Sequence, residues 1–285
     1  MRAIFIIAIS LAAFVASAQQ VNEPAGNPEW SQPYQPFRIV GNVYYVGTYD
    51  LACYLITTPK GHILINTGLA ASADLIPKNI ETLGFKTSDL KILTTTQAHY
   101  DHVGALAALS KLTGAKVYAD AEDADVIEDG GKSDYEMHAR GMTFVPTKVD
   151  RRLKDMDIIE LGGTKLTMLH HPGHTKGSCS FLLDVKDESK TYKVLIANMP
   201  TIVTARKLMG IPEYPTISND IAATLASLKD QTFDIYLSSH ASQFDLHQKH
   251  KPGDPYNPQA FVDRAGYDLK IRELEDAYNR KLLQK

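Results

Sequence analysis

Three side chains that can bind a metal fall within four positions of this chain: His99, Asp101 and His102. They follow an apolar, threonine-rich run of strand type at residues 92–96 and precede a stretch of good helix formers. Because alternate residues of an extended segment point the same way, Gln97, His99 and Asp101 are expected on one side of the strand's end. His102 would join them at the turn into the helix. Imidazole and carboxylate ligands packed in this way suit zinc or a similar divalent ion.

A metal site needs ligands from more than one segment, and two further stretches supply histidines. The first is the loop at residues 170–178, which proline and glycine interrupt and which contains His174. The second follows the apolar run 233–237 and contains His240. A lone histidine in a chain of this size is usually a surface or core residue, whereas a cluster at a strand-to-helix junction seldom is. The sequence therefore predicts a metal site assembled from three separate segments.

The elements that must position these residues follow a regular order. Strands are predicted at residues 37–40, 43–46, 52–57, 62–66, 92–96, 116–119, 156–161, 165–170, 179–185, 192–197 and 233–238. Helices are predicted at residues 71–83, 121–127, 219–228 and 258–283. The glycine-containing stretch 128–147 is interpreted as a long loop that faces the substrate. Two runs of strands, each followed by a helix, suit two packed sheets with helices outside.

The order of the motifs resembles that of the metallo-β-lactamase superfamily. The shared pattern runs from (Q/H)-x-H-x-D-H through G-H-T-x-G-S to a late histidine after a strand, and it covers nearly the whole chain after the leader. A sharper resemblance is to class B β-lactamases of the third subclass, specifically their GOB-like branch. The stretches that carry this sharper resemblance are residues 47–52, 64–68, 96–102, 133–137, 170–181, 196–200 and 240–247.

The resemblance implies both a fold and a set of ligands. The fold would be the α+β, four-layer αβ/βα sandwich of the metallo-β-lactamases, with the site at the sheet ends where its loops meet. Carried over residue by residue, the ligands would be Gln97, His99 and His174 at a first position and Asp101, His102 and His240 at a second. The implied cofactor is Zn²⁺, with one or two ions per chain.

Two residues depart from the broader third subclass, and GOB-like enzymes share both departures. Gln97 stands where most relatives have histidine, and Met199 where many have a serine near the second metal. Because a neutral amide oxygen is a poorer zinc ligand than imidazole, the first position should hold metal more weakly. Asn66 replaces the aspartate common elsewhere in the superfamily. It either orients a ligand or braces its loop, or it is a plain turn asparagine.

The activity that the resemblance implies is zinc-dependent hydrolysis of the β-lactam amide of penicillins, cephalosporins and carbapenems. Asp101 would bind metal and orient the water. The Thr201 hydroxyl would hold the substrate carboxylate, unless it is an ordinary loop threonine. Two other classes stay open: a periplasmic hydrolase of the same fold acting on a lactone or thioester, and a non-enzymatic zinc-binding protein. Open coordination positions argue against the last class.

The first 18 residues are typical of a cleaved targeting segment. Arg2 supplies a positive start, an apolar core of 13 residues follows at 3–15, and Ala16-Ser17-Ala18 matches the small-x-small cleavage rule. That core is short for a spanning helix, which needs about 20 residues. We therefore expect a signal peptide at residues 1–18, a metallo-β-lactamase domain at 19–285, and export to the periplasm without a membrane anchor.

Composition describes an ordinary globular chain. Its 285 residues are 44% hydrophobic and 22% charged, enough to bury a large core. The formal net charge of -3 gives no basic footprint for nucleic acid. The two cysteines, Cys53 and Cys179, lie in apolar, strand-like contexts, which favours buried thiols over a disulfide. We expect a monomer whose partner is a small β-lactam.

Overall fold

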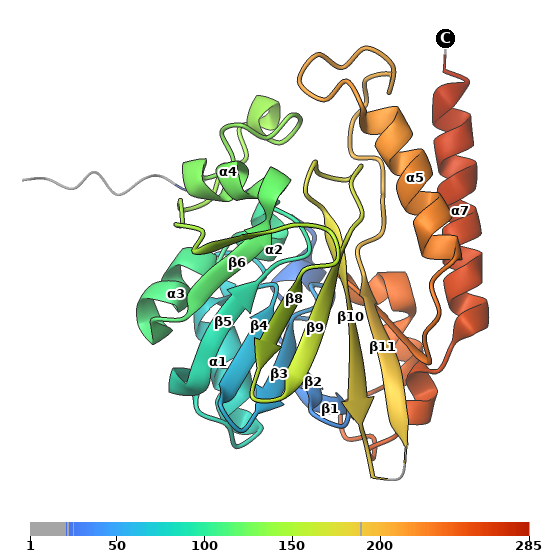
Figure 1. The fold of residues 1–285 in the computed structure, drawn as a ribbon. Helices are drawn as coiled ribbons and strands as arrows, with labels where there is room; N and C mark the ends of the chain where they lie inside the picture. Colours follow the sequence, from blue (N-terminus) through green and yellow to red (C-terminus); the bar gives the residue numbers. More distant parts are fainter. Residues whose placement is uncertain (1–20, 22, 25, 189, 285) are drawn as a thin grey trace, which may run out of the picture.

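Two β-sheets face each other with helices on their outer sides (Figure 1), in a computed structural model that describes residues 21, 23–24, 26–188 and 190–284. The predicted signal peptide at residues 1–18 lies outside the described residues. The layers run helix, sheet, sheet, helix, so the predicted four-layer α+β sandwich is confirmed.

Within the described residues, the N-terminal sheet has seven strands in chain order, β1 to β7. They are β1 (Phe37–Val40), β2 (Val43–Tyr45), β3 (Tyr54–Thr58), β4 (Gly61–Ile65), β5 (Leu90–Thr94), β6 (Lys116–Asp120) and β7 (Arg151–Leu153). Strands β4 to β7 are parallel to one another. Their carboxyl ends therefore lie at one edge of the sheet, which is where the central motif follows β5.

The C-terminal sheet has five strands in the described part of the chain, in the order β12-β11-β10-β9-β8. They are β8 (Ile158–Leu161), β9 (Thr164–His170), β10 (Cys179–Lys186), β11 (Thr191–Ala197) and β12 (Ile235–Ser238). Register pairs His170 with Cys179 and Ala197 with Ser238. The loops after β9, β11 and β12 consequently leave this sheet at the same edge.

Helices cover the outer side of each sheet (Figure 1). The helices of the described residues are α1 (Ser72–Thr82), α2 (Tyr100–Val103), α3 (Leu106–Thr113), α4 (Ala121–Asp129), α5 (Ile217–Lys229), α6 (Leu246–Lys249) and α7 (Arg264–Leu282), of which α2 and α6 are single turns. Short 3-10 turns lie at Pro28–Trp30, Thr87–Asp89, His138–Arg140, Ala241–Phe244 and Pro258–Phe261. One apolar core fills the space between the sheets and extends to α5 and α7. A second core packs the N-terminal sheet against α1, α3 and α4.

Helix α4 shows how local sequence sets an element's limits. The Asp120 side chain accepts a hydrogen bond from the Glu122 amide and so caps the helix N-terminus. The helix ends at Gly130, whose φ of 75° lies in the left-handed region that glycine adopts without strain. These signals fix the start of α4 directly after β6, beside the edge where the motif loops meet.

The elements that differ from the prediction include α6, which has no predicted counterpart, β7 and the terminal helix. Strand β7 was not predicted, because its three residues include Arg151 and Arg152 and show no apolar alternation; pairing with β6 makes it a strand. The terminal helix was predicted as one element from residue 258 but is interrupted. Asp263 caps a new helix start by accepting from the Gly266 amide, so α7 begins at Arg264.

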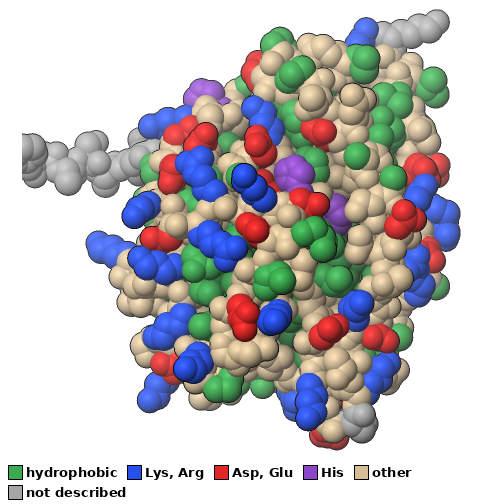
Figure 2. All heavy atoms as spheres, viewed as in Figure 1, with side chains coloured by type: hydrophobic (Ala, Val, Ile, Leu, Met, Phe, Trp, Pro, Cys, Tyr) green, Lys and Arg blue, Asp and Glu red, His purple; other side chains and the backbone are tan. Residues whose placement is uncertain are grey.

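The surface and the thiols agree with the composition. Figure 2 shows acidic and basic side chains interspersed over the face that it draws. Both cysteines of the chain are buried and unpaired in the structure, so the prediction of buried thiols is confirmed. In the part of the chain that the structure describes, no helix is both long and apolar enough to span a membrane.

Candidate metal centre

The central motif occupies the turn that leads from β5 into α2. Thr94 ends the strand and Tyr100 begins the helix, so Gln97 and His99 lie in the turn and Asp101 and His102 in the first helical residues. All four side chains are buried. His174 lies in the loop after β9, and His240 lies two residues after Ser238, the last residue of β12.

Two residues of the first predicted position meet directly. Nδ1 of His99 lies 3.1 Å from Nε2 of His174, and both imidazoles are buried. The other nitrogen of His174, Nδ1, donates to the Thr201 carbonyl oxygen at 2.8 Å and lies 2.9 Å from the Thr201 hydroxyl. Burial lowers the pKa of His174 to about 3. His174 is therefore neutral, with Nε2 free to act as a ligand.

The opposite side of His99 faces an acid. Its Nε2 lies 3.3 Å from Oδ2 of Asp134, within ion-pair distance but outside hydrogen-bond geometry. Burial opposes charge on the ring, yet the Asp134 carboxylate outweighs burial and raises the pKa of His99. An acid on one side of the imidazole thus leaves Nδ1 directed at His174.

The second predicted position forms a compact donor group. One ligand atom from each of Asp101, His102 and His240 lies within 4.8 Å of the others. Oδ2 of Asp101 lies 3.2 Å from Nε2 of His102 and 3.5 Å from Nε2 of His240. Burial disfavours charge on His240, but its hydrogen bonds to Asp101 and Asp50 raise its pKa to about 9. These groups share a proton in this structure, and a bound cation could instead be coordinated by all three of them.

Asp50 holds His240 from behind. Its Oδ2 accepts from Nδ1 of His240 at 3.0 Å and from the indole N–H of Trp30 at 3.1 Å, while its Oδ1 accepts from the Ser242 amide at 2.9 Å. Neither Asp50 nor Asp134 was predicted to act at the site, although both lie in stretches that carry the family resemblance. No spacing signal could find Asp50, because 190 residues separate it from His240.

Asn66 braces the start of the motif. Its φ of 63° is left-handed, and its Oδ1 accepts from the Thr96 amide at 2.9 Å and from the Thr95 hydroxyl at 3.1 Å. Its Nδ2 donates to the Ala52 carbonyl at 3.3 Å. These bonds tie the segment before β3, the end of β4 and the turn after β5 together, which favours the bracing role over a plain turn residue. Met199 is buried in the core between the sheets.

The donors fit a divalent metal. Among the described residues, several buried polar atoms of the motif lack a hydrogen-bond partner: Oε1 of Gln97, Nε2 of His99 and both ring nitrogens of His102. Leaving such a group unsatisfied costs roughly 1–3 kcal/mol each. A cation bound by the motif would relieve part of this cost, and a mixed set of imidazole, carboxylate and amide donors suits zinc.

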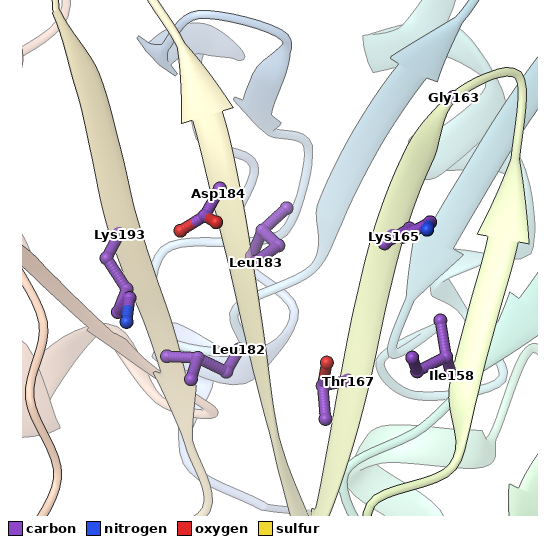
Figure 3. Close-up of a pocket in the computed structure, with 8 residues that line it drawn as sticks. All are labelled: Ile158, Gly163, Lys165, Thr167, Leu182, Leu183, Asp184 and Lys193. Atoms are coloured by element: carbon purple, nitrogen blue, oxygen red, sulfur yellow. The ribbon is translucent and has the colours of Figure 1, made fainter.

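A groove elsewhere on the molecule has no histidine in its lining. About 410 Å³ of space lies on the outer face of the C-terminal sheet, between β8, β9, β10 and β11 (Figure 3). Its lining includes Lys165, Lys193 and Asp184, which lie toward the starts of β9 and β11 and the end of β10, at the sheet edge opposite His170 and Ala197. It contains none of the residues predicted to act in chemistry.

Comparison with known proteins agrees with this geometry. A family model of the metallo-beta-lactamase superfamily matches residues 47–187. The metallo-beta-lactamase GOB-18 from Elizabethkingia meningoseptica is 56% identical, with a TM-score of 0.91 over 93% of this chain and 99% of that chain. The class B3 di-zinc metallo-beta-lactamase LRA-12 from an Alaskan soil metagenome is 58% identical, with a TM-score of 0.90 over 92% of this chain and 100% of that chain.

A more distant similarity covers only part of the chain. The probable hydroxyacylglutathione hydrolase glo2 of Schizosaccharomyces pombe is 31% identical over 146 residues, which span 51% of this chain and 48% of that protein. The similarity to the two metallo-beta-lactamase structures, in contrast, extends over nearly the full length of the chain. The chain belongs to the metallo-β-lactamase superfamily, and its predicted place beside the GOB-like branch of the third class B subclass is confirmed.

Proposed function

We propose that this protein is a zinc-dependent β-lactamase that hydrolyses the amide of penicillins, cephalosporins and carbapenems. The observation that carries the proposal is the extent of the similarity: 56% and 58% identity over 93% and 92% of the chain to two metallo-beta-lactamases. The match to glo2, in contrast, covers 51% of the chain at 31% identity. The buried donors at the sheet edge supply what such a hydrolase needs.

The metal ligands that we propose are Gln97, His99 and His174 at the first position and Asp101, His102 and His240 at the second. The contact between His99 and His174 supports the first position. The 4.8 Å group of Asp101, His102 and His240 supports the second. One or two Zn²⁺ ions per chain would be the cofactor.

The chain's own residues prepare the site by fixing each ring. When bound, zinc supplies Lewis-acid chemistry that acidifies water and polarises a carbonyl. Asp50 and the Thr201 carbonyl each accept the Nδ1 proton of one imidazole, on His240 and His174 respectively, which turns Nε2 of each ring inward. A preorganised site of this kind need not rearrange when charge develops on the substrate.

Two residues are proposed to act on the reactants. Asp101 lies between His102 and His240 and would orient the water through its carboxylate. The Thr201 hydroxyl would hold the substrate carboxylate, while the Thr201 carbonyl keeps His174 in place. A thioester substrate is the second candidate, since glo2 carries the name of a hydroxyacylglutathione hydrolase.

We further propose that residues 19–285 form the mature metallo-β-lactamase domain. The leader at residues 1–18 would be removed during export to the periplasm, and the mature chain would act as a monomer. Mixed surface charge and a net charge of -3 suit a protein without nucleic-acid partners.

A panel assay tests the function. The zinc-loaded protein is offered a penicillin, a cephalosporin, a carbapenem, an acyl-lactone and an acyl-thioester, before and after chelation. We expect chelator-reversible β-lactam hydrolysis that clavulanate-type inhibitors leave intact. The change His240→Ala should lower kcat/KM on the order of 100-fold or more, because several kcal/mol of charge stabilisation are lost.

A matched variant controls for simple loss of a histidine. His62 lies near the start of β4, at the opposite strand end from the motif, so His62→Gln should keep full activity. Full β-lactam hydrolysis in a verified metal-free preparation would refute zinc dependence. Turnover of the thioester or the lactone, with none of any β-lactam, would instead favour the other hydrolase class. Bound zinc without turnover of any substrate would indicate a metal-binding protein.

A further inference from the structure

A buried carboxylate outside the ligand set joins the two loops of the first metal position. Asp123 lies in the first turn of α4 and is 1% exposed. Its Oδ2 accepts from the Ala98 amide at 2.8 Å and from the Thr175 hydroxyl at 2.7 Å. Its Oδ1 accepts from the Gly177 amide at 2.8 Å. A single side chain thus spans two loops that are far apart in the sequence.

The contacts of Asp123 fall beside the ligands of one position. Ala98 stands between Gln97 and His99, and Thr175 directly follows His174. All three ligands of the first position are therefore next to a residue that Asp123 holds. Within the described residues, Asp123 has no hydrogen bond to Asp101, His102 or His240.

The loop after β9 is built to approach Asp123 closely. A Cβ added at Gly177 would lie 2.4 Å from the Asp123 amide nitrogen and 2.7 Å from the Asp123 Cβ. Any larger residue at position 177 would push the loop away from α4. The second glycine of the G-H-T-x-G-S motif thus permits the contact that Asp123 makes.

A different carboxylate serves the second position. Asp50 accepts from Nδ1 of His240 through its side chain, and its main-chain carbonyl accepts from the Ala241 amide at 2.7 Å. The two positions are therefore supported separately, by Asp123 from α4 and by Asp50 from the loop after β2. Loss of one support should change the affinity of one position only.

We propose that Asp123 is a positioning residue for the metal position formed by Gln97, His99 and His174. It sets the separation between the turn after β5 and the loop after β9, and so the distance between His99 and His174. This inference rests on the metal assignment proposed above. Because Gln97 is a weak donor, the geometry of the two imidazoles should matter more here than at a position with three strong ligands.

The test measures metal binding, with Zn²⁺ and Co²⁺ as probes of the full-length mature protein. The variant His240→Ala isolates the first position, and His174→Ala isolates the second. Asp123→Asn is introduced into each background, since asparagine keeps the shape but can no longer accept from all three donors. Equilibrium dialysis gives the zinc affinities, and Co²⁺ absorption reports the ligand geometry.

Asp120→Asn is the matched control. Asp120 is also buried and also lies at the start of α4, but its side chain contacts the Glu122 amide and His170. We expect Asp123→Asn to weaken the first position by about 10–100-fold and to alter its Co²⁺ spectrum. The second position should stay within about twofold, and Asp120→Asn should change neither.

Two results would overturn the inference while leaving the proposed function intact: first-position affinity unchanged by Asp123→Asn, or equal weakening of both positions. Retention of the first-position metal in His174→Ala would refute the ligand assignment itself. If Asp123→Asn does not fold, the variant Thr175→Val tests the positioning role of Asp123 instead. It removes one donor at 2.7 Å and should weaken the first position selectively, by less than the loss of Asp123.

Discussion

At the scale of single residues, two imidazoles of the centre, on His174 and His240, have a supporting oxygen that the amide of Gln97 lacks. His174 and His240 each have one ring nitrogen held by an oxygen, from Thr201 and Asp50 respectively, and His99 faces Asp134. Oε1 of Gln97 is buried without a hydrogen-bond partner among the described residues. The amide therefore brings neither charge nor a supporting oxygen to its metal.

Changing Gln97 to histidine should tighten the first position. An imidazole is a stronger zinc ligand than an amide oxygen, so we expect about 10-fold higher affinity, or about 1.4 kcal/mol. In the wild-type protein the second position should fill first. Zinc titration of both metal-free proteins, following bound metal and nitrocefin turnover, measures this order. Equal first-position affinity in the two proteins would show that Gln97 is not a weakened ligand.

Changing Thr201 to valine separates the two roles of that residue. The hydroxyl is lost, but the carbonyl that accepts from His174 at 2.8 Å remains. We expect KM for a carboxylate-bearing β-lactam to rise about 10-fold, the equivalent of one modest hydrogen bond to a charged group. Zinc affinity should stay unchanged. A fall in zinc affinity with KM unaltered would assign the hydroxyl to His174 instead.

At the scale of elements, His171 links the end of β9 to two neighbours. Its Nδ1 lies 2.7 Å from the Ser180 hydroxyl on β10, and its Nε2 lies 3.0 Å from the Ser227 hydroxyl on α5. Burial lowers the pKa of His171 to about 4 from an ordinary value of 6.5. Between these two pKa values the imidazole is protonated in the unfolded chain and neutral in the folded chain. The stability that the neutral, buried His171 contributes is therefore complete above pH 6.5 and is lost as pH falls toward 4.

The change His171→Gln tests this link, because glutamine does not titrate. Between pH 7 and pH 5 the free energy of unfolding of the metal-free wild-type protein should fall by about 2 kcal/mol more than that of the variant. Urea unfolding at both pH values measures the difference. The ligand histidines titrate in both proteins, so their contribution cancels. Parallel pH dependence in the two proteins would contradict a depressed pKa at His171.

The sequence predicted the strands and helices whose residues carry a clear apolar pattern. Apolar runs predicted most strands, and the 3.6-residue spacing of apolar side chains predicted α1. It missed β7, whose identity depends on pairing with β6. It placed the metal-capable residues but not Asp50, Asp123 or Asp134. These acids act through contacts between distant segments, and a single sequence shows no spacing from which such contacts follow.

At the scale of the whole molecule, we expect removal of the leader to produce the active protein. The leader carries Ala16-Ser17-Ala18 after its apolar core, so cleavage is expected before Gln19. Intact-mass measurement of protein recovered from the periplasm of an expressing cell checks the new N-terminus. A retained Met1 in the exported protein would contradict this prediction. Size-exclusion chromatography of the same sample tests the expected monomer.

The 3-10 turn at Pro28–Trp30 gives this molecule its own optical probe. Trp30 is the one tryptophan in the sequence, and its ring centre lies 5.6 Å from that of His240. Its indole N–H shares Oδ2 of Asp50 with the same histidine. A coloured ion such as Co²⁺ that arrives at His240 should therefore quench the intrinsic fluorescence, and His240→Ala should abolish the response. Ultraviolet emission alone would then follow the filling of one metal position in unlabelled protein, without any substrate.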